Sequence, residues 1–340
     1  MRVGINPAKE AGRLEGYGLH RVIVPVYIPN SDGYFRQSLE ILKLSLESLY
    51  LTASGKAAIT VISNGCSPEV VEELNRMSLS GWFDQLILNR KNRGKVDAIL
   101  SVARGSFEGL TTISDCDVLF KPEWLEAVTE IFRVFPESGL VAPVPSPGSH
   151  WYHASATLLG GLFRRELRLE KVVSDEEMDQ FARSISRPDL YQNEYRAAQV
   201  ILKRGNINAC VGCGHFVFTM RKETLKDAPH YPSLDAVGNS EMLWFDLPND
   251  KRGYWRLATA RAYAYHMGNS LEPWMFRELE EIRKNRSAFS QSPLESVPAA
   301  HRGVLSRVPW SIRENLVNAA RRTGIHKLIF SAMRNKQQRD

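Results

Sequence analysis

The sequence predicts an α/β protein in which helices cover both faces of a doubly wound, mostly parallel sheet, with a basic helical extension at the C-terminus. Short apolar, β-branched runs alternate with amphipathic helical patterns over the first 145 residues, and this rhythm is typical of a parallel sheet with right-handed crossovers. At 43% hydrophobic residues, a chain of 340 residues can also bury a large core. We therefore expect a globular protein whose ligand site lies at the carboxyl ends of the strands.

The predicted strands are short apolar runs, and amphipathic segments follow the first four of them. The run at 22–27 is continuously apolar, as a strand covered on both faces should be. Leucines at helical spacing follow it, and Ser67-Pro68 is an N-cap followed by proline at the first helical position. The strands are expected at 22–27, 58–63, 86–88, 110–114 and 139–144, and the helices at 35–49, 67–77, 96–103 and 121–132.

Polar residues stand where several of these strands end. Asp115-Cys116-Asp117 follows the fourth strand, and two carboxylates on one rigid strand end can hold Mg²⁺ or Mn²⁺ with most of its coordination sphere open. Asn64-Gly65 follows the second strand, where it can turn tightly and offer an amide to a base edge. Asn92-Arg93-Gly94-Lys95 follows the third strand and offers cations and a flexible backbone to a diphosphate. Together these strand ends predict an anion site with a metal.

Positive charge is concentrated in the last forty residues. Residues 301–340 hold nine Lys and Arg against two acidic residues, whereas the whole chain has a net charge of +6. Apolar residues recur there at roughly helical spacing, at Ile312, Leu316, Ala319 and Ala320 and again at Ile325, Leu328, Ile329, Phe330 and Met333. A basic amphipathic helix suits an anionic membrane surface, and a helix packed on the core with a solvated basic face is the alternative. No nucleic-acid partner is expected, because the tail lacks interleaved aromatics.

The number and spacing of the cysteines and the length of the apolar stretches indicate the cellular location of the protein. The four cysteines are too unevenly spaced for a disulfide framework, and Cys210-Val211-Gly212-Cys213 is expected to be a buried apolar pair. Apolar stretches are shorter than the roughly 20 residues of a transmembrane helix, and the N-terminus has no apolar signal region. We expect a cytoplasmic protein that contacts the inner face of the membrane peripherally through its tail.

From residue 21 to 269 the chain resembles the family 2 glycosyltransferases. The matching segments are Val24-Pro25-Val26-Tyr27, Ser63-Asn64-Gly65, Asn92-Arg93-Gly94-Lys95, the Asp-x-Asp triplet, residues 212–221, Glu241, Gly253-Tyr254 and Tyr265-His266-Met267-Gly268. The resemblance implies the Rossmann-like GT-A fold and an inverting, metal-dependent transfer of a sugar, with a UDP-sugar as the expected donor. It also implies a saccharide or glycolipid acceptor and a place in cell-surface polysaccharide synthesis.

The resemblance assigns roles to individual residues and boundaries to four regions. Asp117 is expected to bind Mn²⁺ or Mg²⁺, with help from Asp115 and His266. The expected nucleotide-binding residues are Pro25, Val26, Tyr27, Asn64, Asn92, Gly94, Lys95 and Asp115, and the expected acceptor-binding residues are Gly214, His215 and Trp244. The regions are an N-terminal extension (1–20), a nucleotide-sugar half (21–145), an acceptor half (146–270) and a helical extension (271–340). Charged residues 164–204 are expected to form helices over the acceptor side.

Inversion needs a carboxylate that accepts the proton of the acceptor hydroxyl. The family places Glu-Asp about twelve residues before Gly-Tyr, with the Asp as the base, but here Met242 stands where that Asp is expected. Glu241 is the predicted base, and Asp235 or Asp246 is the alternative. Glu241 follows Asn239-Ser240, and this position also suits an ordinary glutamate in the first turn of a helix.

Three other functions fit parts of the sequence. A non-catalytic sugar-nucleotide-binding relative is compatible with Met242. A haloacid-dehalogenase-like phosphatase also uses Asp-x-Asp, but it places Thr or Val where Leu119 stands. A sugar nucleotidyltransferase would have a glycine-rich loop after the first strand, where Ile28-Pro29-Asn30 stands instead. The glycosyltransferase is the function that the order of motifs favours.

Overall fold

The computed structural model describes residues 4–6, 9, 18–53, 55–236, 240–286 and 294–324. The elements up to the Asp-x-Asp triplet alternate strictly, and each was expected from the sequence. They are β1 (His20–Val26), α1 (Ser38–Ala53), β2 (Ala57–Asn64), α2 (Pro68–Leu79), β3 (Gln85–Asn89), α3 (Lys95–Ala103) and β4 (Leu110–Ser114).

The elements after the triplet are more irregular. They are β5 (Val118–Phe120), α4 (Trp124–Val134), β6 (Ser138–Ala142), α5 (Ser155–Phe163), β7 (Leu167–Glu170), α6 (Asp175–Ser184), α7 (Asn193–Ala197), β8 (Gln199–Arg204), β9 (Ile207–Val211), β10 (Val217–Arg221), α8 (Lys222–Leu225), α9 (Leu247–Arg252), β11 (Trp255–Thr259), β12 (Ala264–His266), α10 (Pro273–Asn285) and α11 (Trp310–Thr323). Four short helical segments complete the list: the 3₁₀ helices η2 (Gly33–Phe35), η3 (Ser149–Trp151) and η6 (Val304–Arg307), and the π-helix η4 (Met242–Asp246).

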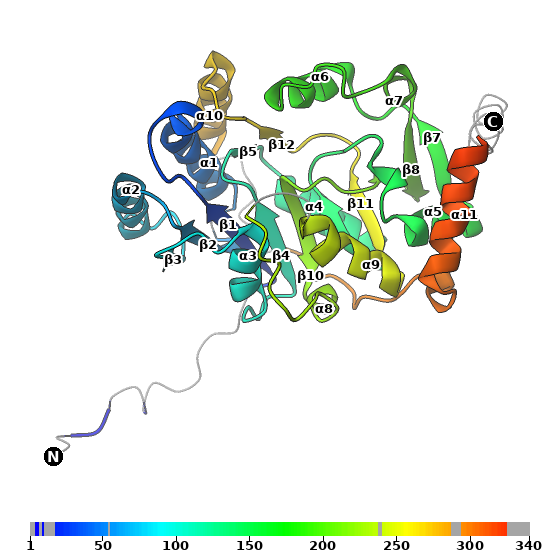
Figure 1. The fold of residues 1–340 in the computed structure, drawn as a ribbon, viewed down its shortest axis with the longest axis horizontal. Coiled ribbons are helices and arrows are strands. Elements are labelled where there is room, and N and C mark those ends of the chain that lie inside the picture. Colours follow the sequence, from blue (N-terminus) through cyan, green and yellow to red (C-terminus); the bar gives the residue numbers. More distant parts are fainter. Residues whose placement is uncertain are drawn as a thin grey trace.

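Ten strands form one sheet in the order β3-β2-β1-β4-β10-β6-β11-β9-β8-β7 (Figure 1). The first four strands pair in parallel, and the pairings from β4 to β7 are antiparallel except that of β6 with β11. As a result β10, β9 and β7 point one way and every other strand of this sheet points the other way. The predicted α/β class, with a mostly parallel sheet, is confirmed. Its carboxyl-end rim is where polar strand ends can meet.

Apolar side chains on alternate strand positions hold helices on both faces of the sheet. Val22, Val24 and Val26 of β1 pack in one buried cluster with α1 and α2, whereas Ile23 packs on the other face with α3. This alternation follows from the two-residue period of a strand. A parallel strand buried on both faces therefore needs the continuous apolar run seen in the sequence.

The segment 164–204 departs from the expectation of helices alone. It includes α6 and α7 but also β7 and β8, which form the far edge of the sheet. The sequence does show the strand period there, because Leu167 and Leu169 are buried while Arg168 and Glu170 are not. The alternation is only four residues long, which is too short to outweigh the charged residues around it.

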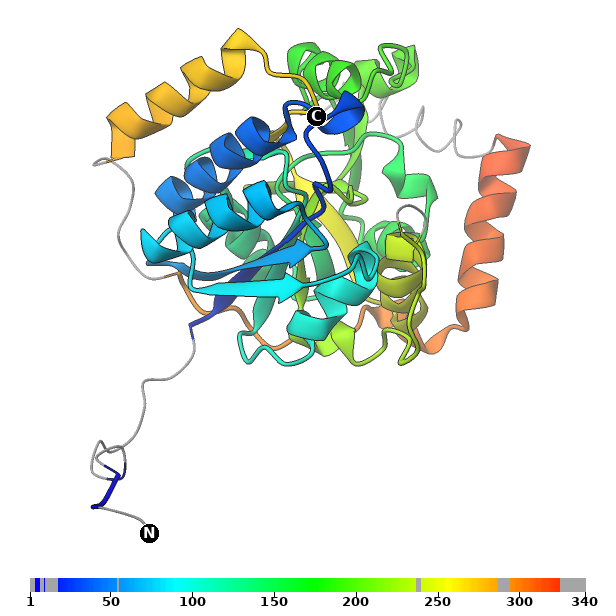
Figure 2. The same cartoon turned by 60° about the vertical axis from the view of Figure 1, so that its left-hand side comes forward.

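The C-terminal region contains the helices α10 and α11, and the described residues 294–303 between them form no regular element. Figures 1 and 2 show α10 beside α1 and α11 at the opposite end of the molecule. Helix α11 packs through Val317 and Arg313, whereas Ile312 and Leu316 are 50% and 55% exposed. The apolar residues expected to continue this pattern, from Ile325 to Met333, lie outside the described residues. None of the helices described here has the length and apolar character that crossing a bilayer requires.

Candidate functional site

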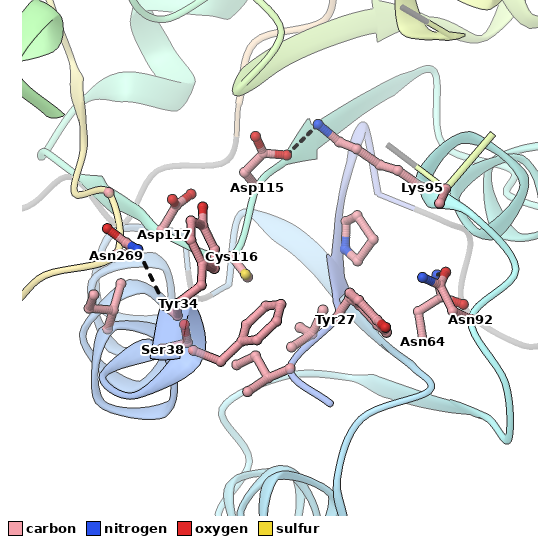
Figure 3. Close-up of a pocket in the computed structure, with 17 residues that line it drawn as sticks. Tyr27, Tyr34, Ser38, Asn64, Asn92, Lys95, Asp115, Cys116, Asp117 and Asn269 are labelled. Atoms are coloured by element: carbon pink, nitrogen blue, oxygen red, sulfur yellow. Dashed lines mark hydrogen bonds and ion pairs between the residues drawn. The ribbon is translucent and has the colours of Figure 1, made fainter. Parts of the chain in front are cut away.

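A cavity of about 480 Å³ lies at the carboxyl ends of β1, β2 and β4 (Figure 3). It is lined by eight of the predicted site residues: Pro25, Val26, Tyr27, Asn64, Asn92, Lys95, Asp115 and Asp117. In Figure 3 the two asparagines and Lys95 lie on one side of Tyr27, and Asp117 and Asn269 lie on the other. We call this space the first cavity. It brings together strand ends that are far apart in the chain.

Amide side chains form one wall of the first cavity. The Asn64 Nδ2 group donates to Asn92 Oδ1 at 2.9 Å and to the Gly94 carbonyl at 3.3 Å, while Asn64 Oδ1 accepts from the Arg93 backbone N–H at 3.1 Å. Gly94 has a φ of 82°, and a Cβ there would meet the Asp235 carbonyl oxygen at 2.3 Å, so only glycine fits this turn. The mutual bonds hold the turn before α3 in one shape and so place the next residue, Lys95.

Lys95 lies between two carboxylates. Its Nζ is 2.5 Å from Asp115 Oδ1 and 2.6 Å from Glu241 Oε1. Burial lowers the pKa of Lys95, but the two carboxylates outweigh it and raise the pKa above its usual value. Burial likewise raises the pKa of Glu241, and the nearby ammonium outweighs it, so the pKa of Glu241 lies below its usual value. Lys95 and Glu241 are therefore both charged at neutral pH.

Asp117 lies on the side of the first cavity away from Lys95. Its Oδ2 is 3.4 Å from His266 Nε2, and the other ring nitrogen of that histidine is 3.0 Å from Ser184 Oγ. Burial raises the pKa of Asp117, and the charge of Asp115 adds to the effect. Burial and the nearby Asp117 charge also raise the pKa of Tyr34. The aspartates thus place more negative charge here than the neighbouring cations balance.

This charge balance is the test of whether a divalent cation fits the site. Among the described residues, three carboxylates, those of Asp115, Asp117 and Glu241, lie around the ammonium of Lys95, and the two aspartates supply the oxygen ligands that Mg²⁺ and Mn²⁺ prefer. Across the described ranges no three His, Cys, Asp or Glu side chains converge as a ready-made metal cage. The arrangement therefore suits a cation that takes its remaining ligands from a bound diphosphate.

A second cavity of about 310 Å³ adjoins the first across His266. Gly214, His215, Tyr152, Asp246 and Arg256 line it, together with His266 itself. His215 Nε2 and Arg256 Nη2 each lie 2.7 Å from the same oxygen, Oδ2 of Asp246. Two of the three predicted acceptor residues, Gly214 and His215, are thus brought together on one wall. We keep the name second cavity for this space.

The third predicted acceptor residue, Trp244, is placed differently. It is 7% exposed, lies in the buried cluster around α3 and packs edge-on against Tyr231 at 5.6 Å between ring centroids. It is not among the described residues that line either cavity, so it offers no stacking face for a sugar. The reason is that η4 turns this side chain toward the core. Glu241, the predicted base, also lines neither cavity.

The remaining sequence motif is the cysteine pair. Cys210 and Cys213 are buried, as expected. Burial raises the pKa of both thiols, to about 12 for Cys210. Thiols in this state are poor nucleophiles and poor metal ligands, so the pair contributes packing.

No family model matches the chain, and no curated protein matches it. Among solved structures, residues 1–349 of S. aureus TarS align with 80% of this chain and 72% of their own length, at 12% identity and a TM-score of 0.43. The chain spans 39% of the longer TarS structure. A mannosyltransferase from Pyrobaculum calidifontis, in complex with GDP-Man and Mn²⁺, aligns with 95% of this chain and 84% of its own, at 12% identity and a TM-score of 0.41.

Several residues of the two cavities were missed in the sequence. Tyr34 and Ser38 come from the turn before α1 and from its first residue, and Asn269 follows β12. Asn269 Nδ2 donates to the Tyr34 carbonyl at 3.3 Å and so joins two segments 235 residues apart. No local pattern could have paired them. Arg256 gave a weak signal only, as a charged residue within an otherwise apolar strand.

Proposed function

We propose that this protein is a metal-dependent, inverting glycosyltransferase of the GT-A type that binds a nucleotide-diphosphate sugar in the first cavity. The observation that carries the proposal is the pairing of the cation Lys95 with Asp115 beside a second carboxylate, Asp117, at the end of one buried strand. A diphosphate needs both a fixed cation and a metal with open positions. Membership of family 2, inferred from the motifs, remains part of the proposal.

The donor would be held along the first cavity. The amides of Asn64 and Asn92 and the ring of Tyr27 face the part of the cavity that suits the nucleoside, and Lys95 lies where it can bind the diphosphate. Asp117 and Asp115 would hold Mn²⁺ or Mg²⁺, with His266 adjacent to Asp117. Such a cation, when bound, neutralises the charge that develops on the departing nucleoside diphosphate.

The acceptor would be a saccharide or glycolipid hydroxyl that approaches from the second cavity. Gly214 leaves space there, because a Cβ on this residue would meet Ser146 only at an ordinary 3.7 Å. Glu241 remains a predicted base, but its contact with Lys95 favours a role in holding that lysine. A UDP-sugar as donor, a role in cell-surface polysaccharide synthesis and peripheral contact with a membrane are parts of the proposal that follow from the sequence.

One experiment tests the proposal. The protein is incubated with UDP-, GDP- and dTDP-sugars and either Mn²⁺ or Mg²⁺, and nucleotide release is followed with and without octyl glycosides as acceptors. Metal-dependent release from one donor, lost in Asp117→Ala, is the expected result. Nucleotide binding without turnover would indicate a non-catalytic relative instead, and phosphate release from p-nitrophenyl phosphate would indicate a phosphatase.

A further inference from the structure

The second cavity contains a histidine that a buried carboxylate holds in place. Asp246 is 1% exposed, and His215 Nε2 lies 2.7 Å from its Oδ2. An imidazole N–H that donates to a carboxylate leaves the other ring nitrogen with a free lone pair. The His215 side chain is 35% exposed and lines the cavity. It is thus a proton acceptor at the wall of a space large enough for part of a sugar.

Arg256 keeps this pair electrically balanced. Its Nη2 is 2.7 Å from the same Asp246 oxygen, and it also donates to the carbonyl oxygens of Cys213, at 2.9 Å, and of Tyr152. Because Arg256 is 1% exposed, the charge of Asp246 is matched inside the protein. The Asp246 carboxylate therefore does not require His215 to be protonated before the reaction. The same carboxylate can stabilise the imidazolium that forms when His215 accepts a proton.

Met242 and Asp246, at the two ends of the π-helix η4, both line this cavity. In η4 the Leu247 N–H bonds to the Met242 carbonyl, five residues back. A π turn is about one residue wider than an α turn. Pro248 favours the wider turn, because in an α-helix its ring collides with the carbonyl four residues earlier, that of Trp244.

Glu241 is less suited to accept a proton. Its Oε1 is bound by Lys95 at 2.6 Å, and it lies outside the described lining of both cavities. A carboxylate that is paired with an ammonium is a weaker base. To accept the proton of a hydroxyl, Glu241 would have to give up part of its interaction with Lys95. Among the described residues, His215 contacts Asp246 and the Phe218 ring, and neither competes for a proton at its Nδ1.

We propose that the second cavity binds the acceptor and that His215, oriented by Asp246, is the general base of the transfer. Nδ1 of His215 takes the proton of the acceptor hydroxyl while the hydroxyl oxygen bonds to the anomeric carbon of the donor sugar. The bond from that carbon to the diphosphate oxygen breaks, and the nucleoside diphosphate leaves with the electron pair. His215 is thus a catalytic residue and Asp246 a positioning residue. The inference rests on the proposed function and names the group that completes it.

The test compares His215→Ala with His301→Ala, which alters an exposed histidine outside the lining of both cavities. The donor found by the nucleotide-release screen is used with Mn²⁺ and an octyl glycoside. We expect His215→Ala to lower kcat by about 100-fold, to bind the nucleotide as tightly as the wild type by calorimetry, and to regain part of its rate when imidazole is added. Asp246→Asn should lower kcat without raising the KM of the acceptor. His301→Ala should behave as the wild type.

Three results would count against the proposal. If His215→Ala keeps kcat within about threefold of the wild type, His215 is not the base. If it loses activity together with thermal stability and imidazole restores nothing, the residue is structural and the inference fails. If the wild type binds no sugar nucleotide at all, the proposed function itself falls and the inference falls with it. If both the wild type and His215→Ala are active, the inference is overturned but the proposed function stands.

Discussion

The two cavities are built in different ways. The first lies at the ends of β1, β2 and β4, and its residues Tyr27, Asn64, Asp115 and Asp117 stand at or just after the end of an apolar strand in the sequence. The second contains an ion cluster, His215, Asp246 and Arg256, whose members come from the loop after β9, from η4 and from β11. Strand ends meet because a parallel sheet aligns them, whereas the second set meets only once distant segments have packed. Donor binding should therefore survive changes that abolish acceptor binding.

The largest effect is expected in the first cavity. Asp117→Asn removes a charge that a divalent cation needs but keeps the shape of the side chain, so turnover should fall by about 1,000-fold. Because burial raises the pKa of Asp117, its ionised form is costly, and the variant should unfold at no lower urea concentration than the wild type. Nucleotide release measured against Mn²⁺ concentration checks the first expectation, and urea unfolding checks the second. Unchanged turnover would remove Asp117 from the metal site.

Lys95→Met tests the ion cluster that supports the first cavity. The change leaves Asp115 and Glu241 beside each other without their cation, so the free energy of unfolding should fall by about 3 kcal/mol. The double variant Lys95→Met/Glu241→Gln should lose less, because one unpaired charge is gone. Urea unfolding measures both. Equal losses in the two variants would show that Lys95 contributes packing alone.

Selective blocking of each cavity tests the comparison directly. Gly214→Val adds side-chain carbon atoms to the second cavity, and its Cβ would meet no atom closer than 3.7 Å, so the KM of the acceptor should rise by about tenfold while that of the donor stays unchanged. Ser38→Leu, at the wall of the first cavity, should raise the KM of the donor and leave that of the acceptor unchanged. Steady-state kinetics with one substrate varied at a time separates the two. Parallel changes in both KM values would mean that the cavities form one site.

The stability contribution of Glu241 should depend on pH in a defined direction. Lys95 outweighs burial and lowers the pKa of Glu241 below its usual 4.5, so the pair stabilises the folded state at higher pH and the contribution is lost as pH falls through the folded pKa. The unfolding free energies of wild type and Glu241→Gln should differ by about 1–2 kcal/mol at pH 7 and converge below pH 4.5. Unfolding curves at several pH values measure this. A difference that grows in acid would contradict the assignment.

The smallest effect is expected at α11, which packs against α5 and α9 on the side of the second cavity. Replacing the exposed Ile312 and Leu316 by Glu should weaken binding to anionic vesicles by about tenfold if this helix contacts a membrane. Thr323→Ser, an exposed change at the end of the same helix, is the control. Co-sedimentation with phosphatidylserine vesicles measures the difference. Equal binding of all variants would remove the membrane from the proposal.

Much of the fold and the first cavity could be predicted from the residues themselves. Continuous apolar runs and helical leucine spacing locate β1 to β4 and their helices, and Asp115, Asp117, Asn64 and Lys95 follow directly as strand-end groups. These signals are local, since burial on both faces of a strand and the helical period depend on neighbouring residues. A helical extension was also predicted for the region that contains α10 and α11, without the bounds of either helix.

The order of residues along the chain specifies which chemical groups are available: two aspartates, a lysine and amides near the ends of apolar strands, and a histidine after Gly214. Their partners depend on how distant segments pack. This packing joined Lys95 to Glu241, turned Trp244 into the core and set Asp246 between His215 and Arg256 through the π turn of η4. Such pairings join segments tens to hundreds of residues apart, and their geometry follows from packing that no short stretch of sequence encodes.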